Sequence, residues 1–292
     1  MKICAIVVTY NRLELLKLTL DKLMKQSHKL DEIIVVNNCC NDGTKEFLEG
    51  LGGQITTLNL NDNVGGAGGF YEGLKLAYGK KYDYYWLMDD DTITMENSLD
   101  ELVKALNILS GRKIGFLCSN VLYKDGKPCI MNIPPIEEEW NELVSESIVK
   151  LMGTSFVSVM ISREAINEVG LPIKEFFIWG DDAEYTYRIS RFFECYMVGR
   201  SKVYHYMNSN SGINIITDSP ERINRYFFQY RNQLFIARKK GIRYVMRYCI
   251  SIISTISKIL LKGNKDKLKK IGIVLKGVYK GILFNPRIEY LK

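Results

Sequence analysis

The chain has 292 residues, of which 47% are hydrophobic and 25% charged, a composition that excludes intrinsic disorder and supports one large domain or one domain with an appendage. Its seven cysteines are an odd number without CxxC spacing, which argues against a disulfide framework or a zinc site and favours a reducing compartment. The net charge is +7, but residues 220–292 hold 18 Lys and Arg against three acids and carry +15, so residues 1–219 carry −8. This division indicates a body with a basic appendage directed at an anionic surface.

The first third of the chain alternates strand and helix patterns. The opening MKICAIVVTYNR has one lysine and a short apolar stretch, and it predicts a first strand rather than a signal peptide. Because strands alternate with helices, we expect a mostly parallel sheet built from βαβ units. The predicted strands are 2–10, 31–38, 54–60 and 82–88, and the predicted helices are 13–26, 45–51 and 71–81.

The remainder continues the pattern less regularly. Residues 94–112 (with SLDELVKALNIL) predict a helix, 113–123 a strand, 153–171 a strand and a helix that ends at Gly170, 175–192 a loop and a helix, and 195–206 a late strand. Residues 124–150 are loop-like and are not assigned. From about residue 220 the pattern becomes helical, tyrosine-rich and basic.

Polar segments follow three of the predicted strands: TYNR (9–12), NNCCND (37–42) and MDDDT (88–92). In parallel α/β sheets, ligands bind beyond the carboxyl ends of the strands. We therefore expect these three segments to converge on one crevice.

The triplet Asp89–Asp91 places three carboxylates side by side at a strand end, where they repel one another. A divalent cation such as Mg²⁺ or Mn²⁺ would neutralise them, and such ions often share their ligands with substrate phosphates. The alternative is a solvated acidic turn.

The order of motifs resembles that of the inverting sugar transferases of glycosyltransferase family 2: TYNR, a polar turn after the second strand, NVGGAGGF, and WLMDDD. The resemblance covers residues 1 to about 235. It implies that Asp91 is the main ligand of a metal bound to the nucleotide-sugar diphosphate, with Asp89 near the ribose or the metal. It further implies that Thr9, Tyr10 and Asn11 line the base pocket, and we add Arg12, Asn63 and Asp90 to the expected nucleotide-sugar contacts.

The second strand departs from the family pattern. Members commonly have VDN there, with the aspartate accepting a hydrogen bond from the pyrimidine imide N–H, whereas this chain has VVNN with Asn37 in that place. An asparagine carbonyl can accept the same bond without a charge. Asp42, in the turn that follows, is either a second nucleotide contact or a turn former.

NVGGAGGF contains Gly65, Gly66, Gly68 and Gly69, and glycines let backbone amides approach a ligand closely. The spacing matches neither a Rossmann fingerprint nor a Walker loop, and the alternative is a flexible turn. The resemblance implies a loop lining the sugar-donor site, in the form typical of galactofuranosyl- and some rhamnosyltransferase-like members.

WGDDAE (179–184) is a second acidic cluster. Inverting transfer needs one carboxylate to remove the proton of the attacking hydroxyl, and the resemblance assigns this to Asp182, although Gly180 is an insertion relative to the family's W-D-D. Trp179, Asp181 and Glu184 are then expected to bind the acceptor. The alternative is a helix N-terminus that favours acidic residues for its own stability, and both interpretations can hold together.

His205 follows the late strand, 23 residues beyond Asp182. A lone histidine there is often structural, but related enzymes have a histidine that completes the metal site. A neutral imidazole suits Mn²⁺, so we expect His205 to be a metal ligand with Asp91 and Asp89.

The basic tail contains CISIISTISKILL (249–261), which we interpret as too short and interrupted to span a bilayer. A basic amphipathic helix lying on a membrane fits better, and the alternative is an ordinary helical bundle. Nucleic-acid binding lacks a supporting motif. We expect the YRN stretch (230–232) to pack near the active site.

These features predict an α/β fold of GT-A type, with a mostly parallel nucleotide-binding sheet over residues 1–219 and a basic helical appendage over 220–292. The predicted function is Mn²⁺- or Mg²⁺-dependent inverting transfer of galactofuranose from UDP-galactofuranose to a lipid-linked or growing surface glycan, at the cytoplasmic face of the cell membrane. dTDP-rhamnose is the alternative donor. A non-catalytic nucleotide- or carbohydrate-binding protein and a metal-dependent nucleotidyltransferase are the alternatives from other classes.

Overall fold

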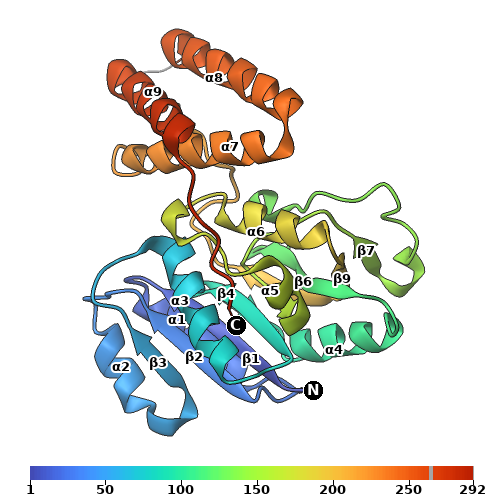
Figure 1. Ribbon diagram of the computed structural model, residues 1–292. Coiled ribbons are helices and arrows are strands. Elements are labelled where there is room, and N and C mark those ends of the chain that lie inside the picture. The colour runs from blue at the N-terminus through green and yellow to red at the C-terminus, as the bar shows by residue number, and fades with distance from the viewer. Residues whose placement is uncertain (263–265, 292) are drawn as a thin grey trace.

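The structure is a computed structural model that describes residues 1–262 and 266–291. The first strand, β1 (Ile3–Thr9), lies inside the sheet, and every one of its residues is buried because strands flank it on both sides and helices cover both faces. Within the described residues, nine strands form one sheet in the order β3-β2-β1-β4-β8-β6-β9-β5, with β7 paired to β9 (Figure 1). The other strands are β2 (Glu32–Asn37), β3 (Thr56–Asn59), β4 (Tyr84–Asp89), β5 (Thr92–Thr94), β6 (Ile114–Tyr123), β7 (Ile148–Lys150), β8 (Val159–Ser162) and β9 (Glu194–His205).

The first half of the sheet is parallel, as the alternating pattern predicts. β1 pairs in parallel with both β2 and β4, and β2 pairs in parallel with β3. Beyond β4 the sheet is mixed, because β8 is inserted antiparallel between β4 and β6 while β6 and β9 are parallel. The predicted α/β fold is therefore confirmed, with four parallel strands in the run β3-β2-β1-β4 and one further parallel pair, β6 and β9.

The two faces of β1 bury alternate side chains against different helices. Cys4, Ile6 and Val8 face a core that includes residues of α3, α5 and α6. Ile3, Ala5 and Val7 face a second core against α1 and α4. The strand's period of two thus builds both layers from one apolar run. The helices around the sheet are α1 (Leu13–Met24), the short α2 (Thr44–Gly50), α3 (Gly65–Gly79), α4 (Ser98–Ile108), α5 (Arg163–Val169) and α6 (Asp181–Ser190).

Helix α3 begins at Gly65, six residues before the predicted start, so the glycine-rich stretch is the first turns of a helix and not a loop. A Cβ on Gly69 would lie 2.5 Å from a methyl group of Val8, and one on Gly73 would lie 2.7 Å from Ile6. The glycines therefore let α3 approach β1 closely. This packing requirement outweighs the low helix propensity of glycine.

Most of the described residues between Ile223 and Leu283 are helical, in line with the sequence pattern: α7 (Tyr226–Lys240), α8 (Ile242–Lys262) and α9 (Lys267–Leu283). The three helices share a core of their own that includes Tyr226, Tyr230, Leu234, Ile259 and Val274. Residues 1–205, which form the sheet and the helices that cover it, are called the sheet region, and α7, α8 and α9 together are called the helical region. α7 lies next to the sheet region, and α8 and α9 project beyond it (Figure 1). The predicted appendage includes residues 263–265 and 292, which lie outside the described residues.

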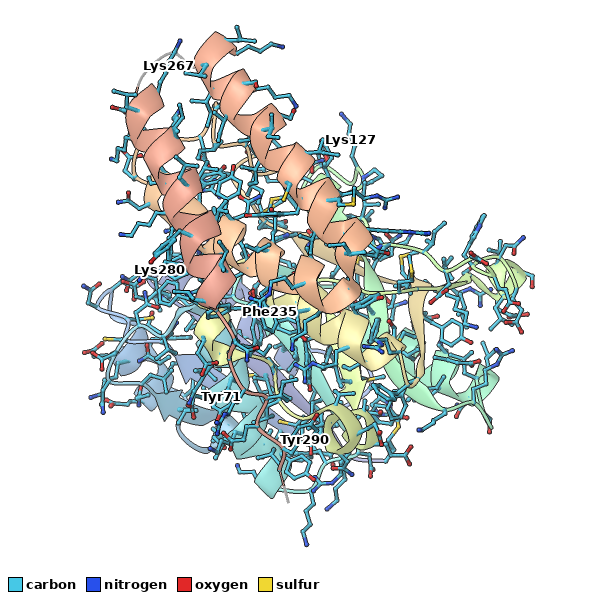
Figure 2. All side chains as sticks on the ribbon, turned by 45° about the horizontal axis from the view of Figure 1, so that its top comes forward. Tyr71, Lys127, Phe235, Lys267, Lys280 and Tyr290 are labelled. Carbon is cyan, nitrogen blue, oxygen red and sulfur yellow. The ribbon has the colours of Figure 1, made fainter. Side chains whose placement is uncertain are left out.

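The C-terminal segment returns from α9 to the sheet region, where Tyr290 lies near Tyr71 of α3 (Figure 2). The carbonyl of Glu289 accepts a hydrogen bond from the N–H of Leu171 at 2.8 Å, and its carboxylate pairs with Lys75 at 2.9 Å. The helical region is thereby attached to the sheet region at both of its ends.

α8 has 21 residues and, by length and composition alone, is the one helix among the described residues that is long and apolar enough to cross a membrane. The length argument made from residues 249–261 is therefore wrong, because the helix begins at Ile242. Most of α8 is exposed, with Ile242 at 73% and Leu261 at 83%.

Candidate active site

The three polar strand ends meet, as predicted from their position in the sheet. The hydroxyl of Thr9 donates to Asp90 Oδ2 at 2.8 Å, which joins the end of β1 to that of β4. The N–H of Asn41 donates to Asn11 Oδ1 at 2.8 Å, and the N–H of Leu13 donates to Asp42 Oδ2 at 3.0 Å. Segments 9–12, 37–42 and 88–92 therefore form one continuous rim at the carboxyl edge of the parallel strands.

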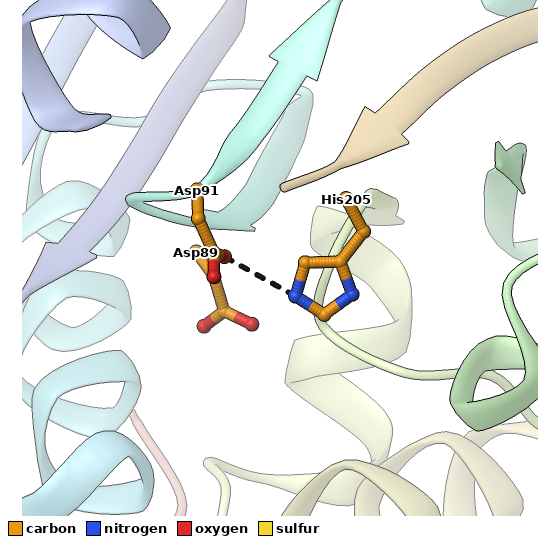
Figure 3. Close-up of side chains that lie close together, drawn as sticks. All are labelled: Asp89, Asp91 and His205. Atoms are coloured by element: carbon orange, nitrogen blue, oxygen red, sulfur yellow. Dashed lines mark ion pairs between the residues drawn. The ribbon is translucent and has the colours of Figure 1, made fainter. Parts of the chain in front are cut away.

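Asp89, Asp91 and His205 lie together on this rim (Figure 3), and one potential ligand atom of each lies within 4.8 Å of the others. The pairing of β5 with β9 explains the meeting, because its register places His205 opposite Thr92, the residue after Asp91. His205 Nε2 is 3.2 Å from Asp91 Oδ1. Residues 114 positions apart in the chain are thus brought together by one antiparallel ladder.

Asn132 sets the orientation of His205. Its Oδ1 lies 2.8 Å from His205 Nδ1, and its Nδ2 donates to Ser155 Oγ at 2.7 Å. Because an amide oxygen only accepts, Nδ1 carries a proton and Nε2 faces the carboxylates. Asn132 belongs to the stretch 124–150 that we could not assign from sequence, and nothing in its local pattern indicates this contact.

These residues fit a divalent cation. Asp91 Oδ1 is buried, and among the described residues its close polar neighbour is the imidazole of His205, itself a potential ligand, so the oxygen keeps a lone pair for a cation. Two carboxylates and one imidazole nitrogen form a donor set that suits Mn²⁺ and, with additional oxygen ligands, Mg²⁺. Asp89, Asp91 and His205 would hold the ion.

Cationic side chains face Asp91. Arg12 Nη1 is 2.5 Å from Asp91 Oδ2 and 3.5 Å from Asp90 Oδ1. Burial alone would raise the pKa of Asp91, but hydrogen bonding to His205 and the charges of His205 and Arg12 outweigh burial and lower it. For His205 burial acts in the opposite direction and would lower the pKa, but the bond to Asp91 outweighs burial and raises the pKa to about 10.

The other two aspartates of the triplet behave differently. Burial raises the pKa of Asp89 to about 6, with a contribution from the charge of Asp91. Burial also raises the pKa of Asp90 to about 7. Asp90 is 4% exposed and accepts hydrogen bonds from Thr9 Oγ1 and from the N–H of Tyr10. It therefore joins the end of β4 to the end of β1. Thr9 and Asp90 thus have a structural role in joining the strand ends, and Tyr10 and Arg12 are exposed; the nucleotide contacts of these residues stay a prediction.

The second strand end is occupied by asparagines. Asn37 is buried: its Oδ1 accepts from the N–H of Cys40 at 3.0 Å and its Nδ2 donates to Asn59 at 2.7 Å. Asn38, which sequence reasoning missed, donates to Asn63 Oδ1 and to Gly65 O, each at 3.1 Å. Asn38 therefore ties β2 to the start of α3, and the doublet NN was its only signal.

Asp42 makes the contacts of a turn former. Its Oδ1 accepts from the hydroxyl of Thr44 at 2.6 Å, and its Oδ2 accepts from the N–H of Leu13. Asp42 thus stabilises the starts of both α1 and α2, which is the turn-forming alternative of the two predicted roles.

The predicted glycine contacts divide into two groups. Gly68 and Gly69 are buried against Val64 and Val8, so they serve packing, and their predicted role as donor contacts stays a prediction. Gly65 has φ +73 and is buried against Phe177. Gly66 is partly exposed at the helix N-terminus, where backbone N–H groups favour anions.

Asp181 and Asp182 begin α6. Gly180 is the N-cap, so neither aspartate is the capping residue, although both are in the first turn, where acidic groups are favoured. Desolvation raises the pKa of Asp182 to about 6, against the effect of a hydrogen bond from the N–H of Ala183 at 2.7 Å. Burial, followed by the charge of Asp182, raises the pKa of Asp181 well above its usual value. The charge of Asp182 contributes to the raised pKa of Asp89, and the charge of Asp89 contributes to the raised pKa of Asp181. The two acidic clusters are therefore neighbours.

Glu184 and Trp179 have other partners. Both carboxylate oxygens of Glu184 pair with Arg188, at 3.0 and 2.9 Å, and Arg188 also donates to Leu171 O. Glu184 thus holds Arg188, which binds the segment before α6, and the predicted role of Glu184 as an acceptor contact stays a prediction. Trp179 is half-buried with its ring against that of Tyr226, 5.1 Å between centroids.

The sheet with helices on both faces is the GT-A fold of glycosyltransferases. The crystal structure of S. aureus TarS aligns with 97% of this chain at a TM-score of 0.56 and 16% identity, and this chain spans 44% of the TarS chain. S. aureus TarS 1-349 in complex with UDP aligns with 97% of this chain, and 72% of its own, at a TM-score of 0.55 and 15% identity. The likeness establishes the fold.

Residues 4–126 match the family model of glycosyl transferase family 2, so this part of the chain is a family 2 glycosyltransferase domain. The galactofuranosyltransferase GlfT1 of Mycolicibacterium smegmatis (strain ATCC 700084 / mc(2)155) is 27% identical over 262 residues, which cover 82% of this chain and 84% of that protein. The predicted class, a nucleotide-sugar-dependent glycosyltransferase, is confirmed. The family match contains Asp89–Asp91 and ends before Asp182 and His205.

Proposed function

We propose that this glycosyltransferase transfers galactofuranose from UDP-galactofuranose, with inversion and with a bound Mn²⁺ or Mg²⁺, to a lipid-linked or growing cell-surface glycan. The observation that carries the proposal is the cluster of Asp89, Asp91 and His205 beside Asp182. The similarity to GlfT1, which extends past both halves of this site, supports galactofuranose as the donor sugar.

Asp89, Asp91 and His205 are the residues that hold the cation, and Asn132 keeps His205 Nε2 directed at it. When bound, the ion neutralises the donor diphosphate and the charge that develops on the leaving nucleotide. Tyr10, Asn11 and Arg12 form the exposed rim on the nucleotide side, and Gly66 offers the N-terminus of α3 to the diphosphate.

Asp182 is the base in this proposal. Its carboxylate takes the proton of the acceptor hydroxyl as that oxygen attacks the anomeric carbon, and the raised pKa makes it a stronger proton acceptor than an ordinary aspartate. Attack from the face opposite the leaving nucleotide inverts the anomeric centre and needs no covalent intermediate. Asp181, buried beside Asp182, contributes to orienting the acceptor side.

The decisive experiment is a donor panel with purified protein: UDP-galactofuranose, UDP-galactopyranose, UDP-glucose and dTDP-rhamnose, each with Mn²⁺ or EDTA. We expect metal-dependent release of UDP from UDP-galactofuranose. Turnover of dTDP-rhamnose alone would move the assignment to the rhamnosyltransferase alternative. Binding without turnover of any donor would indicate a catalytically silent protein, and release of a sugar 1-phosphate would indicate nucleotidyl chemistry.

We also propose that residues 220–292 attach the enzyme to the cytoplasmic face of the membrane. The supporting observation is an exposed apolar surface on α8 with basic residues between its members. Such a surface suits a helix that lies at an anionic bilayer. The apolar members are Ile242, Met246, Ile250, Ile253, Leu260 and Leu261, and the basic ones are Arg243, Arg247 and Lys258.

Sedimentation with phosphatidylcholine vesicles, with and without phosphatidylglycerol, tests the attachment. We expect binding that requires the anionic lipid and that the pair Arg243→Glu and Arg247→Glu abolishes. The pair Lys29→Glu and Lys45→Glu, exposed residues of the sheet region, is the control of equal charge change. Equal binding by both pairs would contradict the proposal.

A further inference from the structure

The turn that precedes α6 has a strained backbone. Phe177 has φ +64, Trp179 has φ +65 and Gly180 has φ +88. A left-handed conformation is unfavourable for bulky aromatic residues, and it persists only where surrounding contacts enforce it. The turn leads directly into Asp181 and Asp182, so whatever enforces its conformation also sets the start of α6.

Asn232 of α7 makes these contacts. Its side chain is completely buried, and Nδ2 donates to three carbonyl oxygens of the turn: Phe176 at 3.0 Å, Ile178 at 3.2 Å and Trp179 at 2.8 Å. The two N–H groups of one amide thus serve three of the four carbonyls of residues 176–179, and the fourth, that of Phe177, is directed elsewhere.

Arg231 orients the amide. Its Nε donates to Asn232 Oδ1 at 3.0 Å, so the oxygen of the amide is occupied and the NH₂ group faces the turn. Its Nη2 donates to the carbonyl of Glu175 at 2.5 Å, one residue before those that Asn232 binds. The guanidinium lies over the ring of Phe284, 4.0 Å from its centroid, which holds it in place.

The other side of the same turn contacts the donor side of the site. The carbonyl of Phe177 accepts from the N–H of Ala67 in the first turn of α3 at 3.2 Å. A Cβ on Gly65 would overlap that carbonyl, so glycine is required there. The turn therefore lies between α7 on one side and the start of α3 on the other.

We propose that Asn232 is a positioning residue, which holds the 176–180 turn and thereby sets the place of Asp182 relative to the donor. The inference rests on the assignment of Asp182 as base under the proposed function. It makes α7 part of the catalytic apparatus, because the residue that fixes the turn comes from outside the sheet region.

Asn232→Asp is the sharpest substitution. It preserves shape, removes both N–H donors and directs a carboxylate oxygen at three carbonyls. We expect kcat to fall about 10- to 100-fold while the dissociation constant for UDP, measured by calorimetry, changes less than about twofold, because the turn places the base and not the nucleotide. Gln233→Glu, the same change at the next, exposed residue of α7, is the matched control and should leave both quantities unchanged.

A spectroscopic measurement reports on the turn without using activity. The chain has three tryptophans, Trp86, Trp140 and Trp179, so 5-fluorotryptophan labelling gives three ¹⁹F resonances that Trp→Phe variants assign. In Asn232→Asp the Trp179 resonance should shift or broaden while those of Trp86 and Trp140 remain. Gln233→Glu should leave all three in place.

An unchanged Trp179 resonance in folded Asn232→Asp, or parallel losses of kcat and UDP affinity, would overturn the proposal. Should Asn232→Asp not fold, Asn232→Ser decides by the same two readouts, since its hydroxyl retains one donor; we expect a smaller fall in kcat and a smaller Trp179 shift. If Asp182→Asn kept the kcat of the wild type, the assignment of Asp182 as base would be refuted, but the proposal for Asn232 and the turn would not. The Trp179 resonance would still report whether Asn232 holds the turn.

Discussion

Asp89–Asp91 follow a strand and face the cationic groups Arg12 and His205, whereas Asp181 and Asp182 begin a helix and, among the described residues, form no ion pair. The pKa of Asp91 is lowered and those of Asp181 and Asp182 are raised. The first cluster contains one carboxylate, Asp91, held as an anion beside Asp89 and Asp90, whose pKa values are raised by burial, whereas both carboxylates of the second cluster have a raised affinity for a proton. Two acidic motifs that look equivalent in the sequence are thus prepared for different chemistry by their neighbours.

Removing the base tests the second cluster most severely. In Asp182→Asn we expect kcat to fall about 10³-fold with UDP affinity unchanged, because the amide cannot take the acceptor proton. Glu184→Gln on the same helix should stay close to wild-type kcat, since Glu184 pairs with Arg188. Steady-state kinetics and calorimetry measure the two effects, and equal losses in both variants would erase the distinction between these carboxylates.

Removing the anionic carboxylate tests the first cluster. In Asp91→Asn we expect the affinity for Mn²⁺, followed by electron paramagnetic resonance of the free ion, to fall about 100-fold, since a buried ligand oxygen loses its charge. Asp42→Asn, at an exposed turn, should bind Mn²⁺ as the wild type does. Full Mn²⁺ affinity in Asp91→Asn would place the metal elsewhere.

The orientation of His205 provides a finer test. In Asn132→Leu we expect Mn²⁺ affinity to fall about tenfold, because the imidazole loses the partner that directs Nε2 at the carboxylates. Asn141→Leu, an exposed position in the same stretch, controls for disturbance of the loop. Equal affinity in both variants would mean that Asn132 does not set the imidazole.

The smallest expected effect is in the pH profile. The pKa of Asp182 is raised to about 6, and only the ionised carboxylate accepts a proton, so kcat should be about half-maximal near pH 6 and decline below it. An unperturbed aspartate would keep its activity to about pH 4. Asp181, beside it, and Asp89, across the site, are the acidic groups that share its surroundings. A profile flat from pH 7 to pH 5 would contradict the raised pKa.

Much of the fold follows from sequence because the apolar runs 3–9, 32–37 and 84–89 have one stable arrangement, a buried parallel sheet, and this arrangement brings their polar ends together. The membership of Asp91 and His205 in one cluster was implied only by the family resemblance. The structure explains it by the three-residue strand β5, too short to identify from its pattern.

The remaining features depend on contacts between distant residues. Asn132 and Asn232 are ordinary polar residues in the sequence, and their roles arise from what the fold places against them. The glycines of 65–69 suggest a loop, yet they begin a helix, in which Gly69 meets Val8 of the neighbouring strand and Gly65 meets Phe177 with no room for a side chain. Glu184 has a partner one helical turn away, and its pairing with Arg188 was readable but outweighed by the acidic motif around it.

The return of residues 284–291 to the sheet region has a mechanical consequence. The helical region is joined to the sheet region at α7 and again through Glu289 at Leu171 and Lys75, so two separate sets of contacts hold it in place. α8 is about 30 Å long at 1.5 Å per residue, and its exposed apolar residues extend from Ile242 to Leu261. A surface that binds these residues would meet α8 along its side, and the two sets of contacts would then fix the orientation of the crevice relative to that surface.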